Sequence, residues 1–158
     1  MNENNNNIIL NNKISNKNNY LLEMIRNQRK NIPYNMKLYL NDLRRIIDFI
    51  PSSIFTNECC QWQGYITNFN NDKKGTYVNF YYKKKKRALH RLLFVNFKDS
   101  LEVNEYVRFT CEHKGYCCSI NCMYKVKYNN IKKLSNTKNI KNNISNKNIN
   151  LNFEIKFE

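Results

Sequence analysis

The sequence predicts a small α+β fold stapled by a metal ion, and three observations lead to this prediction. Apolar residues recur at helical spacing in residues 35–50 and 88–97. Residues 62–69 and 76–82 are instead rich in β-branched and aromatic side chains, which favour strands. Four of the six cysteines lie within residues 111–122, a density that is typical of a metal-binding loop.

Length and charge narrow the class of protein. The chain has 158 residues, which suits one domain with a modest core. Its 27 lysines and arginines against 12 acidic residues give a formal charge of +15, which attracts nucleic acid or, second, an anionic membrane surface. No stretch reaches the roughly 20 apolar residues of a membrane span, and the N-terminus lacks the pattern of a secretory signal. We therefore expect an intracellular protein with reduced thiols.

The N-terminal third divides into two parts. Residues 1–19 are rich in asparagine and poor in apolar side chains, so we expect them to be disordered. Residues 20–56 are a predicted helical segment, in which Pro33 separates a first helix from a second one over residues 35–50. The second helix carries a broad apolar stripe and ends before Pro51.

Residues 57–132 form the predicted folded domain, because they hold all six cysteines, the tryptophan and both histidines. The expected order is strand, strand, helix, cysteine loop and helix. The first strand covers residues 62–69 and the second residues 76–82, where the basic run 83–87 interrupts it. The helix covers residues 88–97, so the domain begins as a ββα unit.

The C-terminal end returns to the composition of the N-terminal end. Residues 133–148 consist mostly of asparagine, lysine and serine, and we expect a disordered basic tail. Residues 149–158 alternate apolar and polar side chains, which predicts one terminal strand.

The spacing of the cysteines favours zinc. Five residues separate Cys111 from Cys117, and four separate Cys117 from Cys122. Short loops of this kind let thiolates converge on one tetrahedral ion, and we prefer zinc to disulfides or unliganded thiols. The fourth ligand must come from elsewhere, and Cys59 or Cys60 can supply it.

The order of motifs around these cysteines resembles the zinc-binding loop of the His-Me finger endonucleases, in particular the His-Cys box homing endonucleases. The shared features are a cysteine shortly before Trp62, a hairpin, the run His90-Arg91-Leu92, and Asn121 in a motif that lacks its usual proline. They lie within residues 60–130. The resemblance implies a His-Me-finger-like ββα fold and four zinc ligands, with cysteine in place of the usual histidine at the last position: Cys60, Cys111, Cys117 and Cys122.

The resemblance also locates the chemistry. In the family, a histidine at the end of a strand is the general base, and an asparagine on the following helix holds a separate Mg²⁺ ion. The matching positions are Phe109 and Asn130, with Asn129 beside it. Phenylalanine cannot accept a proton, so we expect impaired cleavage. His90 and His113 are the candidate substitute bases, although packing or phosphate contact explains His90 and a loop position explains His113.

Six basic residues are the candidate nucleic-acid contacts: Lys83, Lys84, Lys85, Lys86, Arg87 and Arg91. They adjoin a strand that lies in a DNA groove in the family, so the resemblance favours DNA over RNA as the partner. Trp62 and the tyrosines are expected to form the core around the metal. Their alternative role is to provide platforms on which nucleobases stack.

Three functions remain open at this point. The preferred interpretation is a zinc-binding, His-Me-finger-like protein that binds nucleic acid and cleaves it poorly. The first alternative is an active, metal-dependent DNA endonuclease that uses His90 or His113. The second is a small basic zinc protein that docks into a transcription or ribosomal assembly. The zinc pattern fits all three, and Phe109 disfavours the active endonuclease.

Overall fold

The computed structural model describes residues 3–69, 71 and 74–127 of the chain, with side chains from residue 14 onward. Over these residues the fold is mixed α+β, which confirms the predicted class, and it contains three helices and two small antiparallel sheets. In chain order the elements are α1 (Glu3–Asn27), α2 (Leu40–Ile47), β1 (Asn79–Tyr82), β2 (Lys85–Ala88), α3 (Leu89–Phe97), β3 (Glu105–Phe109) and β4 (Met123–Lys127).

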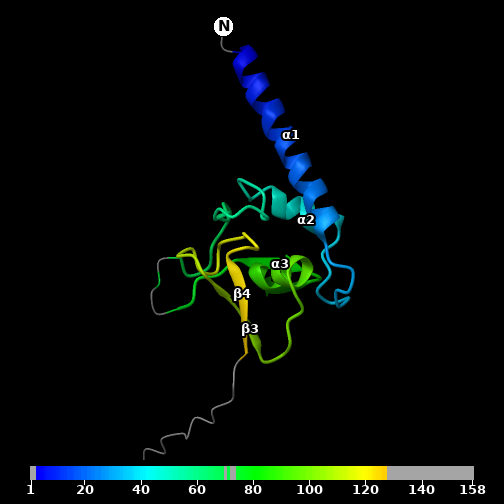
Figure 1. Cartoon of the computed structure of the whole chain (residues 1–158). Coiled ribbons are helices and arrows are strands. Elements are labelled where there is room, and N and C mark those ends of the chain that lie inside the picture. Colours follow the sequence, from blue (N-terminus) through cyan, green and yellow to red (C-terminus); the bar gives the residue numbers. More distant parts are fainter. Residues whose placement is uncertain (1–2, 70, 72–73, 128–158) are drawn as a thin grey trace, which may run out of the picture.

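Helix α1 projects from the rest of the molecule, and its C-terminal part packs against α2 (Figure 1). The expectation of disorder over residues 1–19 therefore differs from the structure, which has helix from Glu3 onward. The first 32 residues contain neither glycine nor proline, so nothing in them breaks a helix. The buried side chain of Met24 and an ion pair between Lys17 and Asp48, 3.1 Å, fix the packed end.

Helix α2 is shorter than the predicted 35–50. The chain first turns at Pro33, whose carbonyl accepts hydrogen bonds from the backbone of residues 36 and 37. The helix begins after Tyr39, whose N–H donates to the Asp42 carboxylate at 3.1 Å. Its buried side chains are Leu43, Ile46 and Ile47.

The first hairpin consists of β1 and β2, paired from Asn79↔Ala88 to Tyr82↔Lys85. Lys83 and Lys84 form its two-residue turn, with φ angles of 45° and 61°. Two positive φ values are what a type I′ turn requires. The prediction that residues 83–87 interrupt the strand was therefore wrong in part, because residues 85–87 belong to the returning strand.

The strand predicted over residues 62–69 is not continuous. Its backbone contacts three different segments: Trp62 N–H donates to Tyr116, Gln63 N–H to Phe49, and Thr67 pairs with Tyr77. Because the partner changes every few residues, no ladder of hydrogen bonds forms.

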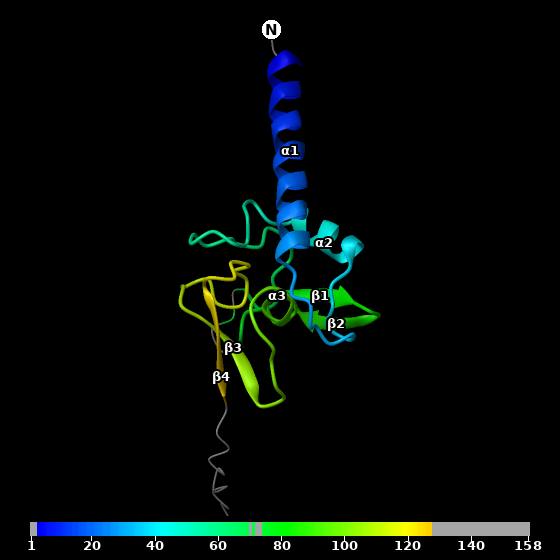
Figure 2. The ribbon, with the colours of Figure 1, turned by 45° about the vertical axis from the view of Figure 1, so that its right-hand side comes forward.

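Helix α3 lies between the two hairpins, in contact with β2 and β3 (Figure 2). Its Asn96 is fully buried, and the side-chain amide makes four hydrogen bonds. The oxygen accepts from Gln28 and from the Leu38 N–H, both at 2.9 Å, and the nitrogen donates to the Met36 and Leu92 carbonyls at 2.8 and 2.7 Å. One side chain thus joins α3 to the ends of both N-terminal helices.

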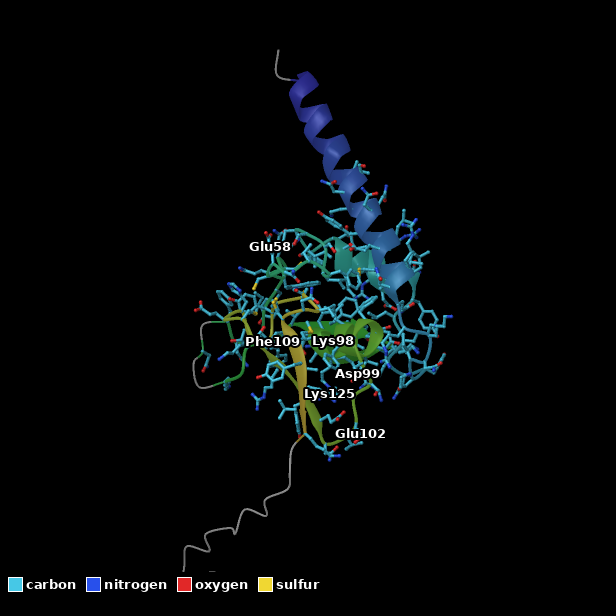
Figure 3. All side chains as sticks on the ribbon, in the orientation of Figure 1. Glu58, Lys98, Asp99, Glu102, Phe109 and Lys125 are labelled. Atoms are coloured by element: carbon cyan, nitrogen blue, oxygen red, sulfur yellow. The ribbon has the colours of Figure 1, made fainter. Side chains whose placement is uncertain are left out.

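The second hairpin pairs β3 with β4, from Glu105↔Lys127 to Phe109↔Met123. The sequence predicted a helix after the cysteine loop, but the structure places strand β4 directly after Cys122. Lys125 holds this strand to the segment after α3 through an ion pair with Asp99, 2.7 Å (Figure 3). It also forms an ion pair with Glu105 of β3, 3.7 Å. The predictions for Asn130, for residues 133–148 and for residues 149–158 lie outside the described residues.

Candidate metal centre

Four cysteine side chains converge at the end of the β3–β4 hairpin. They are Cys59, from the segment that follows α2, and three from the connection between the strands: Cys111, Cys117 and Cys122. Their sulfur atoms all lie within 4.8 Å of one another, and 3.8 Å separates the Sγ atoms of Cys59 and Cys122. The four thiols could therefore coordinate a single metal ion. We call this group the cysteine cluster.

The turn at Gly115 shapes the connection that carries three of the thiols. Gly115 has a φ of 85°, and an added Cβ atom would lie 1.8 Å from the Thr76 carbonyl oxygen. Only glycine tolerates both the conformation and the close approach. Across this turn, the carbonyl of His113 accepts a hydrogen bond from the Cys117 N–H at 2.9 Å. The carbonyl of Gly115 itself accepts one from the Val78 N–H at 3.3 Å.

Cys60, the fourth ligand that the resemblance implies, lies outside the cysteine cluster, and Cys59 takes its place. The side chain of Cys60 is fully buried in the apolar core, where the thiol approaches the Ser52 carbonyl at 3.4 Å. Neighbouring side chains in an extended segment point to opposite sides, so Cys59 faces the cysteine cluster when Cys60 faces the core. Cys118, which follows Cys117 in the sequence, is also buried and is not part of the cluster.

The thiols of the cluster share hydrogen bonds, and their pKa values move in different directions. Burial, followed by hydrogen bonds with Cys122 and Cys111, raises the pKa of Cys59 to about 11. Burial also raises the pKa of Cys117. Burial acts to raise the pKa of Cys122 as well, but hydrogen bonds from Ser119 and the other thiols outweigh it and lower that pKa. The thiol of Cys122 therefore ionises more readily than those of Cys59 and Cys117.

Polar contacts near the cysteine cluster connect the segment that carries Cys59 with the connection that carries the other three cysteines. The Asn121 side-chain amide donates to the Phe55 carbonyl at 3.0 Å, to the Thr56 carbonyl at 3.3 Å and to the Asn57 side chain at 3.0 Å. Lys98, just after α3, donates to the carbonyls of Ile120, 3.0 Å, and Met123. No sequence pattern points to Lys98 in this region, because its partners are backbone atoms.

Phe109 and His90 lie side by side, with ring centroids 5.5 Å apart in an edge-to-face arrangement. Phe109 is the last residue of β3, next to the cysteine connection (Figure 3). Burial, assisted by the nearby charge of Arg91, lowers the pKa of His90 to about 4. The ring is therefore neutral at pH 7 and a weak base. Its Nδ1 atom is buried, with no hydrogen-bond partner among the described residues.

His113 lies within the cysteine connection, yet outside the cysteine cluster. Its Nε2 atom is 2.9 Å from the side-chain nitrogen of Gln61. An amide nitrogen can only donate, so Nε2 accepts this hydrogen bond and the proton resides on Nδ1. The lone pair of His113 Nε2, which a general base would need, is thus engaged in the hydrogen bond with Gln61.

The candidate nucleic-acid contacts divide between two surfaces. Lys84, Lys85 and Lys86 are exposed at the tip of the β1–β2 hairpin. The ammonium of Lys83 is instead engaged within the protein, because it donates to the Tyr34 carbonyl and lies 3.5 Å from the centre of the Tyr34 ring. Arg87 and Arg91 are half-buried and line a small hollow of about 250 Å³ together with Lys86.

Comparisons with known proteins identify one relative by sequence and none by structure. The chain is similar to an uncharacterised protein of Acanthamoeba polyphaga mimivirus, with 51% identity over 114 residues, which is 72% of this chain. The aligned part spans one third of that protein's length, 33%. No model of a known protein family matches the chain, and no solved structure matches it. None of the helices over the described residues has the length and apolar content to cross a membrane.

Proposed function

We propose that the cysteine cluster binds one Zn²⁺ ion and that the zinc-stapled chain binds nucleic acid while cleaving it poorly. The distance between sulfur atoms supports the choice of zinc. A tetrahedral ion with Zn–S bonds of about 2.3 Å has S···S edges of about 3.8 Å, which matches the distance between Cys59 and Cys122. Four thiolates with no open position favour a structural rather than a catalytic zinc site.

The lysines at the hairpin tip are the observation that carries the nucleic-acid proposal. Lys84, Lys85 and Lys86 are exposed on consecutive residues, and no described carboxylate forms an ion pair with them. Their charges are therefore available to phosphates, and the excess of positive charge over the whole chain strengthens the attraction.

Poor cleavage is inferred from the surroundings of Phe109. The resemblance to His-Me finger endonucleases assigns this position to the general base, and the order β1, β2, α3, β3 and then the cysteine connection is compatible with that family. His90 is next to it, but burial makes this ring a weak base. His113 is engaged by Gln61. Neither histidine is therefore well placed to replace the lost base.

The zinc proposal is tested by metal analysis of matched variants. The purified, reduced protein should contain about one zinc per chain. Cys59→Ser should lower the zinc content and destabilise the domain, because the binding energy of a structural metal is also folding energy. Cys60→Ser is the matched control and should retain zinc, since its thiol faces the core. Zinc-free folded protein, or zinc loss only in Cys60→Ser, would contradict the assignment.

The binding proposal is tested by salt dependence. Replacement of Lys84, Lys85 and Lys86 by glutamine should weaken binding to duplex DNA on every sequence. It should also flatten the slope of log K against log[salt] by roughly 0.9 for each phosphate contact that is lost. Lys17→Gln serves as the control, because Asp48 already neutralises that ammonium. The absence of binding at low salt would instead favour a protein that docks into a larger assembly.

Cleavage is measured on supercoiled plasmid with Mg²⁺ or Mn²⁺. We expect no cleavage or very slow cleavage by the wild type, and faster cleavage by Phe109→His, because a general base contributes about 10²–10⁴-fold. His90→Ala and His113→Ala test the two substitute bases. Rapid wild-type cleavage that survives both alanine substitutions contradicts the interpretation of Phe109.

A further inference from the structure

The β3–β4 hairpin has one buried and one exposed face. Val107 and Met123 point into the core, with 8% and 1% of their surface exposed. On the other face, Arg108 lies opposite Tyr124, and Tyr124 and Val126 are 43% and 41% exposed. A sheet that presents an aromatic and a cationic side chain together on its open face is a surface suited to a ligand with flat rings and negative charge.

This exposed face contributes to the lining of a hollow with a volume of about 760 Å³. We call it the hairpin hollow. Tyr124 and Val126 line it from β4, Phe109 from the end of β3 and Tyr116 from the cysteine connection. Phe109 and Tyr116 are only partly buried, so both contribute apolar ring surface to it. Three aromatic side chains therefore contribute to its lining: Tyr124 from the exposed face of the hairpin, Phe109 from the opposite face at the end of β3, and Tyr116.

Charged side chains surround the same hollow. Lys74, Arg108 and Lys114 contribute three positive charges and Glu112 one negative charge. None of the three cations takes part in an ion pair with a described carboxylate. An aromatic interior with a border that carries more positive than negative charge over the described residues is complementary to nucleobases that are attached to a phosphate backbone.

The geometry points to the hairpin hollow as a site for the unpaired bases of single-stranded nucleic acid. This inference rests on the proposed binding of nucleic acid and specifies which form is bound. Bases in a duplex are already stacked on their neighbours and cannot reach aromatic walls in a concave site. Bases of a single strand stack on Tyr124, while Arg108 and Lys114 contact the flanking phosphates. The lysines at the tip of the β1–β2 hairpin contact phosphates of either form.

The test compares two labelled ligands by fluorescence anisotropy: a short oligothymidylate and a duplex of the same length. The wild type should bind the single strand more tightly. Tyr124→Thr removes the ring, while threonine keeps the propensity of this position for a β-strand. The substitution should weaken binding of the single-stranded ligand roughly 5- to 150-fold, the range expected for one stacked base. Duplex binding should not change. Tyr124→Phe retains the ring and should retain the affinity.

Tyr65→Thr is the matched control, because Tyr65 is 82% exposed and lies outside the hollow. Zinc content and circular dichroism establish that each variant is folded. If Tyr124→Thr binds the single strand as the wild type does, or if Tyr65→Thr weakens binding equally, the hollow is not the site, while the proposed function still stands. If the wild type binds neither ligand, both proposals are wrong.

Discussion

Asn96 should be one of the most sensitive positions outside the cysteine cluster. The substitution Asn96→Ala removes four hydrogen bonds at once from a fully buried position and leaves the Leu38 N–H and the Met36 carbonyl without their partners. Each net hydrogen bond contributes about 1 kcal/mol, and an unsatisfied buried group costs about 1–3 kcal/mol. We therefore expect a loss of about 4 kcal/mol, a large part of the roughly 5–15 kcal/mol that stabilises a domain.

The measurement is urea unfolding of the zinc-loaded protein, followed by the fluorescence of Trp62, the only tryptophan in the chain. With a typical urea dependence of about 1–3 kcal/mol per molar, the midpoint should fall by about 1.3–4 M. Asn79→Ala is the matched control, because its side chain donates one hydrogen bond, to Thr67 at 3.1 Å. A midpoint for Asn96→Ala within experimental error of that control would refute the reasoning.

Three further substitutions test other contacts. Gly115→Ala should destabilise the domain by more than about 2 kcal/mol in thermal unfolding, because it adds both strain at positive φ and a clash with a carbonyl. The pKa of about 4 for His90 lies below its ordinary value of 6.5, so the unfolded state takes up the proton first as the pH falls. Stability should therefore drop by about 3 kcal/mol from pH 7 to pH 4, and His90→Gln should remove that part of the loss in unfolding curves recorded across the range. Lys98→Met breaks the hydrogen bonds to the carbonyls of Ile120 and Met123, on either side of Cys122, and should speed zinc transfer to a chelator, whereas Lys114→Met should not.

Local patterns predicted the elements whose contacts are local. The segment 88–97 has helical spacing in the sequence and forms α3. Three of the four clustered cysteines were found from spacing, because Cys111, Cys117 and Cys122 lie on one short connection and their separation in sequence limits their separation in space.

Features that depend on distant contacts could not be predicted. Cys59 and Cys60 are adjacent and chemically identical, so only the burial of Cys60 beside Ser52 decides between them. Residues 62–69 have the composition of a strand but meet several different partners, which composition does not reveal. Helix α1 extends through a segment rich in asparagine because propensity is a weak signal compared with the absence of any helix breaker.

The position of Cys59 in the chain affects how a metal ion bound by the cysteine cluster would contribute to stability. Cys59 precedes Cys111 by 52 residues, a stretch that contains both strands of the first hairpin, α3 and β3. A cross-link that closes a loop of this length removes about 4 kcal/mol of chain entropy from the unfolded state, if a metal is treated like a disulfide. The other three thiols lie so close in sequence that they can gather around an ion before the chain folds. Metal bound by those three alone favours the folded state only weakly, since the unfolded chain binds it too. Excess zinc should therefore raise the unfolding temperature of the wild type more than that of Cys59→Ser.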